Sequence, residues 1–285
     1  MKGFTLPELL VVVAVVATLA GVAWGAYASL QQESLDRLGR VQLDEAAKAF
    51  RLFHQDTGYW PGAGPFALVP VGNVETPSGA GVDCSNMGSG GVPRSSLPAV
   101  EVVSGLDDQG EWFAHPANLW QLAWAPQVCV NHAQARLAVW DAESGRGWRG
   151  PYLAPDKLRL VDVGNALLPD GTGDASAQPT RRDLYGLGAG AEREAADPGY
   201  GECTTPGDCA FQWRILRRTA LGYDANGHDL ARHGRPLLYF GPATGRARLV
   251  YLGADGRFGG LDGAAPCAAN ATGPGGEDDV VACLE

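Results

Sequence analysis

Basic side chains are scarce in this chain. Its 285 residues include 22 Lys and Arg against 32 Asp and Glu, which gives a formal net charge of -10. Nonspecific nucleic-acid binding depends on a basic surface that neutralises phosphates, so this composition argues against it. No Ser/His/Asp or Cys/His set has a spacing typical of nucleophilic catalysis, and we therefore expect no enzymatic activity.

Close CxxC pairs are also missing, which argues against a zinc site. The chain has six cysteines: Cys84, Cys129, Cys203, Cys209, Cys267 and Cys283. An even number of cysteines spread through a Gly-rich region behind a membrane segment is typical of disulfides in an oxidising compartment. Spacing alone leaves many pairings open. Proximity in the sequence favours Cys203 with Cys209 and Cys267 with Cys283, which leaves Cys84 with Cys129.

Charge is missing altogether from one long stretch near the start of the chain. The run Leu9–Leu30 contains no charged side chain. A bilayer core takes roughly 20 apolar residues as a helix, and a helix satisfies its own backbone groups in lipid. Lys2 precedes the run, whereas Arg37 and Arg40 follow it beside acidic residues, so charge does not decide the orientation. The predicted disulfides decide it instead, and they predict a head in the periplasm or outside the cell.

The residues before this run form a specific pattern. They read Gly3-Phe4-Thr5-Leu6-Pro7-Glu8, with a small residue, an aromatic residue and a carboxylate at fixed offsets. The pattern resembles the cleavage and methylation signature of type IV prepilins and of the related pseudopilins of type II secretion. The resemblance implies cleavage after Gly3 by a prepilin peptidase and methylation of the Phe4 amine. It also implies that Glu8 pairs with the Phe4 amine of a neighbouring subunit in a filament.

Two other interpretations of this start remain open. Glu8 would be favoured in the first turn of any helix, because the helix dipole stabilises negative charge there. The run could also be an ordinary secretory signal cleaved at Ala26-Tyr27-Ala28, which would make Ser29 the first residue of the mature protein. Pro7 departs from the aliphatic residue usual at its position in the family, although a first helical turn tolerates proline.

The apolar run continues into an amphipathic segment. Residues 31–56 carry apolar side chains at helical spacing and charged side chains on the other faces, and Gly58 and Pro61 follow them. One helix over residues 4–56 would be about 80 Å long. The predicted divisions are a leader (residues 1–3), a transmembrane and assembly half-helix (4–30), an amphipathic half-helix (31–56) and a globular head (57–285).

Much of the head lacks regular periodicity. Residues 62–98 and 164–212 are predicted to be loops, whereas Arg235–Gly241 and Arg246–Leu252 are predicted to form a β-hairpin. The segment Gly147–Leu153 resembles a pseudopilin turn in which Trp and Tyr side chains pack beneath the backbone. Together these features predict an α+β, pilin-like fold, in which the long N-terminal helix packs on an antiparallel β-sheet head with long loops.

A glycine-rich acidic loop near the C-terminus predicts a structural calcium site. Calcium takes oxygen ligands from carboxylates and carbonyls on sharply bending loops. The segment Leu252–Gly260 closely resembles the calcium loop of major pseudopilins. That resemblance implies these ligands: the Leu252 carbonyl, Asp255, Asp278 and Asp279. The spacer over residues 261–277 is longer than in the family, so Asp262 and Glu277 could join or replace them. The alternative is a solvated acidic turn without a metal.

Three functions fit these features. The first is a major-pseudopilin-like subunit of a type II secretion system, and the second is a minor pilin of a type IV pilus used in adhesion or motility. Both imply self-association, other pilins or pseudopilins, a prepilin peptidase and an inner-membrane assembly platform as partners. Both also imply a single-pass inner-membrane protein with its head in the periplasm or on a surface filament. The third is a membrane-tethered periplasmic binding domain that never polymerises.

Overall fold

A computed structural model provides the architecture of the protein. It describes residues 6–62, 82–87, 93–95, 118–123, 135–163, 184–192, 213–219, 222–229, 233–242, 246–253, 256, 258–259, 267–268 and 276–285. These residues form one long helix, three sheets and three short 3-10 helices.

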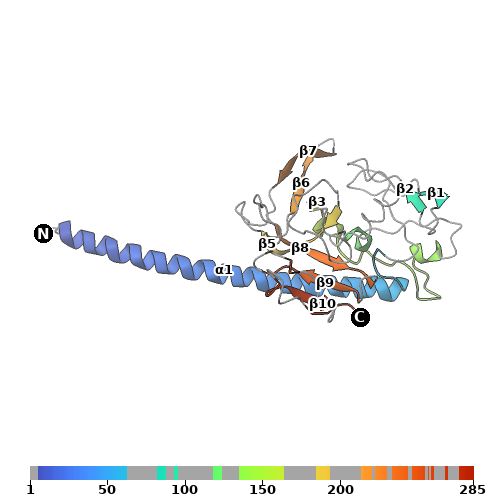
Figure 1. Ribbon diagram of the computed structural model, residues 1–285, viewed down its shortest axis with the longest axis horizontal. Helices are drawn as coiled ribbons and strands as arrows, with labels where there is room; N and C mark the ends of the chain where they lie inside the picture. The colour runs from blue at the N-terminus through green and yellow to red at the C-terminus, as the bar shows by residue number, and fades with distance from the viewer. Residues whose placement is uncertain are drawn as a thin grey trace.

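The long helix α1 spans Leu6–Thr57 without interruption. Figure 1 shows its first half projecting away from the rest of the molecule, while the head packs along its second half. The helix ends where Gly58, with a positive φ of 80°, donates its N–H to the His54 carbonyl at 2.7 Å. Glycine adopts this left-handed conformation without steric cost, which makes it a common helix terminator. The predicted long N-terminal helix is confirmed.

The second half of α1 forms one wall of the hydrophobic core. Its inward side chains recur every three or four residues and are almost fully buried: Leu43, Ala46, Ala47, Phe50 and Phe53. This spacing places them on one helical face. Phe50 packs against Tyr239 of the sheet with ring centroids 4.6 Å apart. The amphipathic pattern of the sequence therefore corresponds to a helix face that the head covers.

A four-stranded sheet lies against this half of the helix. Its order is β10-β9-β8-β5. The strands are β5 (Gly188–Glu192), β8 (His233–Phe240), β9 (Arg248–Tyr251) and β10 (Val280–Cys283). All neighbouring strands are antiparallel, and β8 pairs with β9 from Leu237↔Tyr251 to Phe240↔Arg248. The predicted hairpin is therefore present, and with it the α+β fold of helix on antiparallel sheet.

Helix and sheet approach each other closely at Gly39. A side chain added there would lie 2.7 Å from the hydroxyl oxygen of Tyr251, which is completely buried in β9. Such a distance is shorter than any ordinary contact, so only glycine leaves room for the tyrosine ring against the helix backbone. Gly39 thus marks the point where the helix enters the head.

A second antiparallel sheet has the order β4-β3-β6-β7. Its strands are β3 (Arg159–Val163), β4 (Leu184–Gly186), β6 (Trp213–Thr219) and β7 (Gly222–Asp229). Figure 1 shows β6 and β7 on the side of the head away from α1. Only Leu187 separates β4 from β5, so the chain passes directly from the outer sheet to the sheet on the helix.

Two predicted loop regions contain strands, and these predictions are wrong in those places. Within residues 62–98, β1 (Val82–Met87) pairs with β2 (Pro93–Ser95). Within residues 164–212, β4 and β5 join the two larger sheets. The sequences of β1, β2 and β5 are polar or glycine-rich, so they lack the alternation that identifies a strand. Backbone pairing forms these strands instead: β1 pairs with β2, which follows it closely, whereas β5 pairs with β8 far along the chain.

Three short 3-10 helices connect these sheets to the rest of the chain, and the first of them packs on the core. They are η1 (Trp120–Leu122), η2 (Ala135–Ala138) and η3 (Pro155–Lys157). Leu119 and Leu122 are fully buried, and the Leu122 carbonyl accepts hydrogen bonds from the backbone N–H groups of Tyr152 and Leu153 at 2.7 and 3.0 Å. These bonds hold the segment around Pro151 against the core.

Candidate functional site: the N-terminal helix and the C-terminal loop

The first half of α1 presents an apolar surface that the described head does not cover. Residues Leu6–Tyr27 form a span long and apolar enough to cross a membrane, and none of it is buried within the protein. Every large apolar side chain of this span is exposed by half or more. Exposed apolar area on this scale is unfavourable in water, so it requires lipid or other protein subunits around it.

Glu8 lies in the first turn of this span. An acidic side chain stabilises a helix there, because the free backbone N–H groups carry partial positive charge. Glu8 is also the one charged residue of Leu6–Tyr27. The predicted processing residues Gly3 and Phe4 lie outside the described residues, so their cleavage, methylation and pairing with Glu8 remain predictions.

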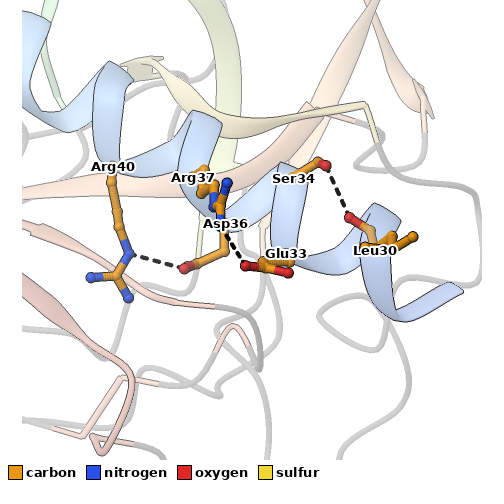
Figure 2. Close-up of polar contacts among 6 residues, drawn as sticks. All are labelled: Leu30, Glu33, Ser34, Asp36, Arg37 and Arg40. Atoms are coloured by element: carbon orange, nitrogen blue, oxygen red, sulfur yellow. Dashed lines mark hydrogen bonds and ion pairs between the residues drawn. The ribbon is translucent and has the colours of Figure 1, made fainter. Parts of the chain in front are cut away.

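The segment of α1 between the span and the head carries charge in matched pairs. Figure 2 shows Arg37 paired with Glu33 at 2.6 Å and Arg40 paired with Asp36 at 2.9 Å. The acidic partner precedes the basic one by four residues, the order that supports a helix best. Each exposed pair stabilises the helix by only about 0.3–0.5 kcal/mol. They help to keep this segment helical where neither lipid nor the core supports it.

The end of α1 is joined to the head through a buried carboxylate. Asp56 accepts a hydrogen bond from the Tyr152 hydroxyl at 3.0 Å and forms an ion pair with Arg149 at 3.2 Å. Trp148 donates its indole N–H to the Gln121 carbonyl at 3.2 Å and meets Tyr152 edge-on, with centroids 5.8 Å apart. Burial raises the pKa of the Tyr152 phenol above its usual range, so it stays a hydrogen-bond donor.

This arrangement bears out the predicted packing of Trp and Tyr beneath the turn at Gly147–Leu153. The two segments that meet here, around Asp56 and around Tyr152, were each visible in the sequence. Their hydrogen bond was not predicted, because 96 residues separate Asp56 from Tyr152. No local pattern in the sequence pairs residues so far apart.

The predicted calcium ligands Leu252, Asp278 and Asp279 lie on neighbouring segments of the chain. Gly253 and Gly256 both have positive φ, and the Leu252 carbonyl accepts the Gly256 N–H at 3.2 Å. A side chain at Gly253 would lie 2.6 Å from the Asp278 carbonyl oxygen, so the acidic segment packs directly on the loop. Asp279 is buried, and its Oδ2 accepts the Gly259 N–H at 3.0 Å.

These residues offer the oxygen donors that calcium prefers, on a loop that glycine allows to turn sharply. Asp255 and Asp262 lie outside the described residues, and Glu277 is exposed to solvent. Among the residues that the structure describes, no three His, Cys, Asp or Glu side chains gather closely enough to hold a metal ion. The described residues fit calcium only in the type of donor atom that they offer, and the metal itself remains a prediction.

The C-terminal strand is attached to the head in three ways. Cys267 and Cys283 form the predicted disulfide, with Cα atoms 5.4 Å apart. Arg51 of α1 donates to the Cys283 carbonyl at 2.6 Å and to the Leu284 carbonyl at 3.3 Å. The Leu284 N–H donates to the Ala247 carbonyl at 2.9 Å. These contacts tie the acidic loop to the same half of α1 that forms the core.

The other predicted disulfides are not tested by the structure. Cys129, Cys203 and Cys209 lie outside the described residues. Cys84 lies in β1, where only its place in the strand is described. The pairings Cys203–Cys209 and Cys84–Cys129 therefore stay predictions.

Comparison with known proteins identifies the start of the chain. The prokaryotic N-terminal methylation motif matches residues 1–24. The chain carries a type IV pilin-like prepilin signature. This signature implies processing by prepilin peptidase and assembly with other pilins, and the exposed apolar helix fits a single-pass membrane anchor. No curated protein and no solved structure matches the chain.

The match ends inside the apolar span, so the prepilin signature covers the processing residues and Glu8 but not the head. The fold of helix on antiparallel sheet agrees with the signature independently. The particular filament to which the subunit contributes depends on the head.

Proposed function

We propose that this protein is a structural, non-catalytic subunit of a periplasmic pseudopilus in a type II secretion system. One observation carries the proposal. A single helix joins an uncovered, membrane-length apolar half to a half that is built into the head. A subunit of this shape is stable in the membrane and can bury its apolar half again among the helices of other subunits.

The acidic C-terminal loop favours a pseudopilin over other pilin-like subunits. Gly253 lies against Asp278, and the Gly259 N–H donates to Asp279, which supports the resemblance to the loop of major pseudopilins. We propose that this loop holds a structural calcium ion through the Leu252 carbonyl, Asp255, Asp278 and Asp279. Calcium would offset the repulsion between the carboxylates and hold a segment that has few apolar contacts.

Calcium binding is testable by thermal unfolding of the full chain in detergent. We expect excess calcium to raise the melting temperature and EDTA to lower it, because a ligand of the folded state stabilises that state. Replacing Asp278 and Asp279 by Asn should abolish the difference. Glu143→Gln is the control, since it removes the charge of an exposed acid that lies outside the acidic loop. Identical melting curves with calcium and with EDTA would contradict the calcium site.

A minor pilin of a type IV pilus is the second candidate. The head contains two sheets besides the one on α1: the outer sheet β4-β3-β6-β7 and the β1–β2 pair. They enlarge the head on the side away from the helix (Figure 1). A large head on that side would face outward from a filament whose helices pack at its centre. This surface would suit adhesion or motility better than transport within the periplasm.

The two candidates differ in what the cell loses without the chain. In a strain lacking it, lost protein export with intact surface pili would support the pseudopilus. Intact export with lost or altered pili would support the pilus and overturn the secretion role. A periplasmic binding domain that never polymerises would leave both intact.

Filament assembly itself is tested at Glu8. We expect Glu8→Ala to abolish assembly while the chain still inserts in the membrane and its head still folds, because Glu8 lies far from the core. Glu33→Ala is the matched control, since Glu33 is an exposed acid of the same helix with a partner inside its own chain. Crosslinking of subunits in the membrane measures both variants. Equal assembly by Glu8→Ala and the wild type would contradict the filament role.

A further inference from the structure

The span ends in two aromatic side chains that no part of the described head contacts. Trp24 and Tyr27 are 76% and 64% exposed. They are three residues apart in α1, so they lie on the same face of the helix. They are also the aromatic residues of the span, whose other large side chains are Leu and Val.

The described part of the head does not cover these two rings. Among the residues of α1 whose burial is described, the first buried one is Gly39, twelve positions beyond Tyr27, or about 18 Å along the helix axis. Between them Glu33, Arg37 and Leu38 are exposed, whereas Leu35 and Asp36 are part-buried, and the charges are paired within the helix itself. The part of the chain that the structure describes therefore leaves Trp24 and Tyr27 open to another partner.

Their position along the helix points to the surface of the membrane. From Leu6 to Trp24 the helix rises about 27 Å, and from Leu6 to Tyr27 about 32 Å, which brackets a hydrocarbon core of about 30 Å. The first charge after the span is Glu33, about 9 Å beyond Tyr27. Trp and Tyr have an apolar ring and a polar N–H or O–H, and they concentrate where hydrocarbon meets headgroups.

We propose that the side chains of Trp24 and Tyr27 lie at the lipid–water interface on the side of the head and fix the depth of the helix of the unassembled subunit in the membrane. The indole and phenol groups lie at headgroup level, the apolar residues from Leu6 onward fill the hydrocarbon core, and the exposed charges of Glu33, Arg37 and Arg40 lie in water. The two rings thereby set the depth of the helix, and the paired charges of the segment hold the head clear of the membrane. This interfacial position does not depend on which filament the subunit joins.

Depth-dependent fluorescence quenching tests the interfacial position of Trp24. The full chain is reconstituted in phosphatidylcholine vesicles that carry bromine either near the headgroups or near the ends of the acyl chains. Of the eight tryptophans, all but Trp24 lie at Trp60 or beyond, in the head. We expect headgroup-level bromine to quench emission more strongly than deep bromine, by roughly the one part in eight that Trp24 supplies. Trp24→Phe should remove this quenching.

A tryptophan placed in the middle of the span calibrates the depth. In Trp24→Phe/Val16→Trp the new indole should be quenched more by deep bromine than by shallow bromine. Stronger quenching of Trp24 by deep bromine would place it inside the hydrocarbon and overturn the proposal. Quenching of the Val16→Trp indole but not of Trp24 would show that protein, such as a neighbouring subunit, covers Trp24, and would also overturn it. If neither indole is quenched, the span is not inserted in the membrane, and the proposal is overturned.

Discussion

The two halves of α1 belong to one continuous helix but owe their stability to different surroundings. In the first half, Leu19 is 64% exposed, whereas in the second half Leu43 is 1% exposed. A leucine therefore contributes to the core of the head in the second half and to an uncovered apolar surface in the first half. A helix is a backbone arrangement, and its side chains decide whether water, lipid or protein must surround it.

The largest expected effect on stability comes from replacing one leucine by alanine in each half of the helix. Leu43→Ala should lower the free energy of unfolding of the head by about 2–5 kcal/mol, because it removes buried contacts and leaves a cavity. Leu19→Ala should leave it unchanged. Chemical denaturation of the full chain in detergent, followed by near-ultraviolet circular dichroism, measures both. Equal losses would mean that the first half also packs on the head.

Glycines in the two halves sharpen the comparison further. Gly39→Ala should lower the free energy of unfolding by about 1–3 kcal/mol, because its methyl group would overlap the buried ring of Tyr251. Gly25→Ala is the control, since nothing lies within 4 Å of a side chain added there. The same denaturation assay should show no loss for Gly25→Ala. A harmless Gly39→Ala would show that helix and sheet are farther apart than the structure places them.

A buried phenol in the head predicts the response to high pH. Burial, assisted by the charge of Glu285, raises the pKa of Tyr239 well above its ordinary value. The unfolded phenol loses its proton near pH 10 while the folded one keeps it, so the free energy of unfolding should fall as pH rises above about 10. The fall becomes linear with pH once the unfolded phenol is fully ionised, and it ends when the folded phenol also ionises.

Tyr239→Phe should make that fall shallower at high pH and cost little at neutral pH. Among the described residues, the Tyr239 hydroxyl has no hydrogen-bond partner that the substitution would break. Denaturation curves measured at neutral and at alkaline pH give both quantities. An unchanged alkaline slope in Tyr239→Phe would mean that other groups cause the loss.

The smallest effect is expected between the two halves, where helix stability rests on exposed charge. Arg37→Ala removes the ion pair with Glu33 and should reduce helix stability by about 0.3–0.5 kcal/mol. The loss should shrink as salt is added, because salt screens exposed charges. Hydrogen exchange of the α1 amides around Arg37 measures it. A loss as large as that of Leu43→Ala would mean that this segment packs on the head after all.

Several features of the molecule could be predicted because they depend on neighbours in the sequence. The apolar run, the amphipathic spacing after it, the β8–β9 hairpin and the Trp148–Tyr152 turn all follow from local patterns. The packing of Asp278 and Asp279 on the loop at Leu252 came from resemblance to a family, not from spacing. The Cys267–Cys283 disulfide came from proximity.

Other features could not be predicted because they join residues far apart. Nothing near Asp56 indicates Arg149 or Tyr152 as its partners, and nothing near Arg51 indicates the carbonyls of Cys283 and Leu284. The strands β1, β2 and β5 were assigned to loops because their sequences are polar or glycine-rich. Backbone hydrogen bonds form them, between β1 and β2 and between β5 and the distant β8, and such bonds leave no periodic pattern in the side chains.

The sequence by itself determined that the chain begins with a prepilin signature and continues as one long helix, half of it suited to lipid. Charge distribution and periodicity act along the helix, so they are readable residue by residue. Only the tertiary structure decided where the helix enters the head, because that point depends on Gly39 meeting the ring of Tyr251. It also decided that the C-terminal strand and the acidic loop are tied to α1, since burial and long-range hydrogen bonds exist only once the chain has folded.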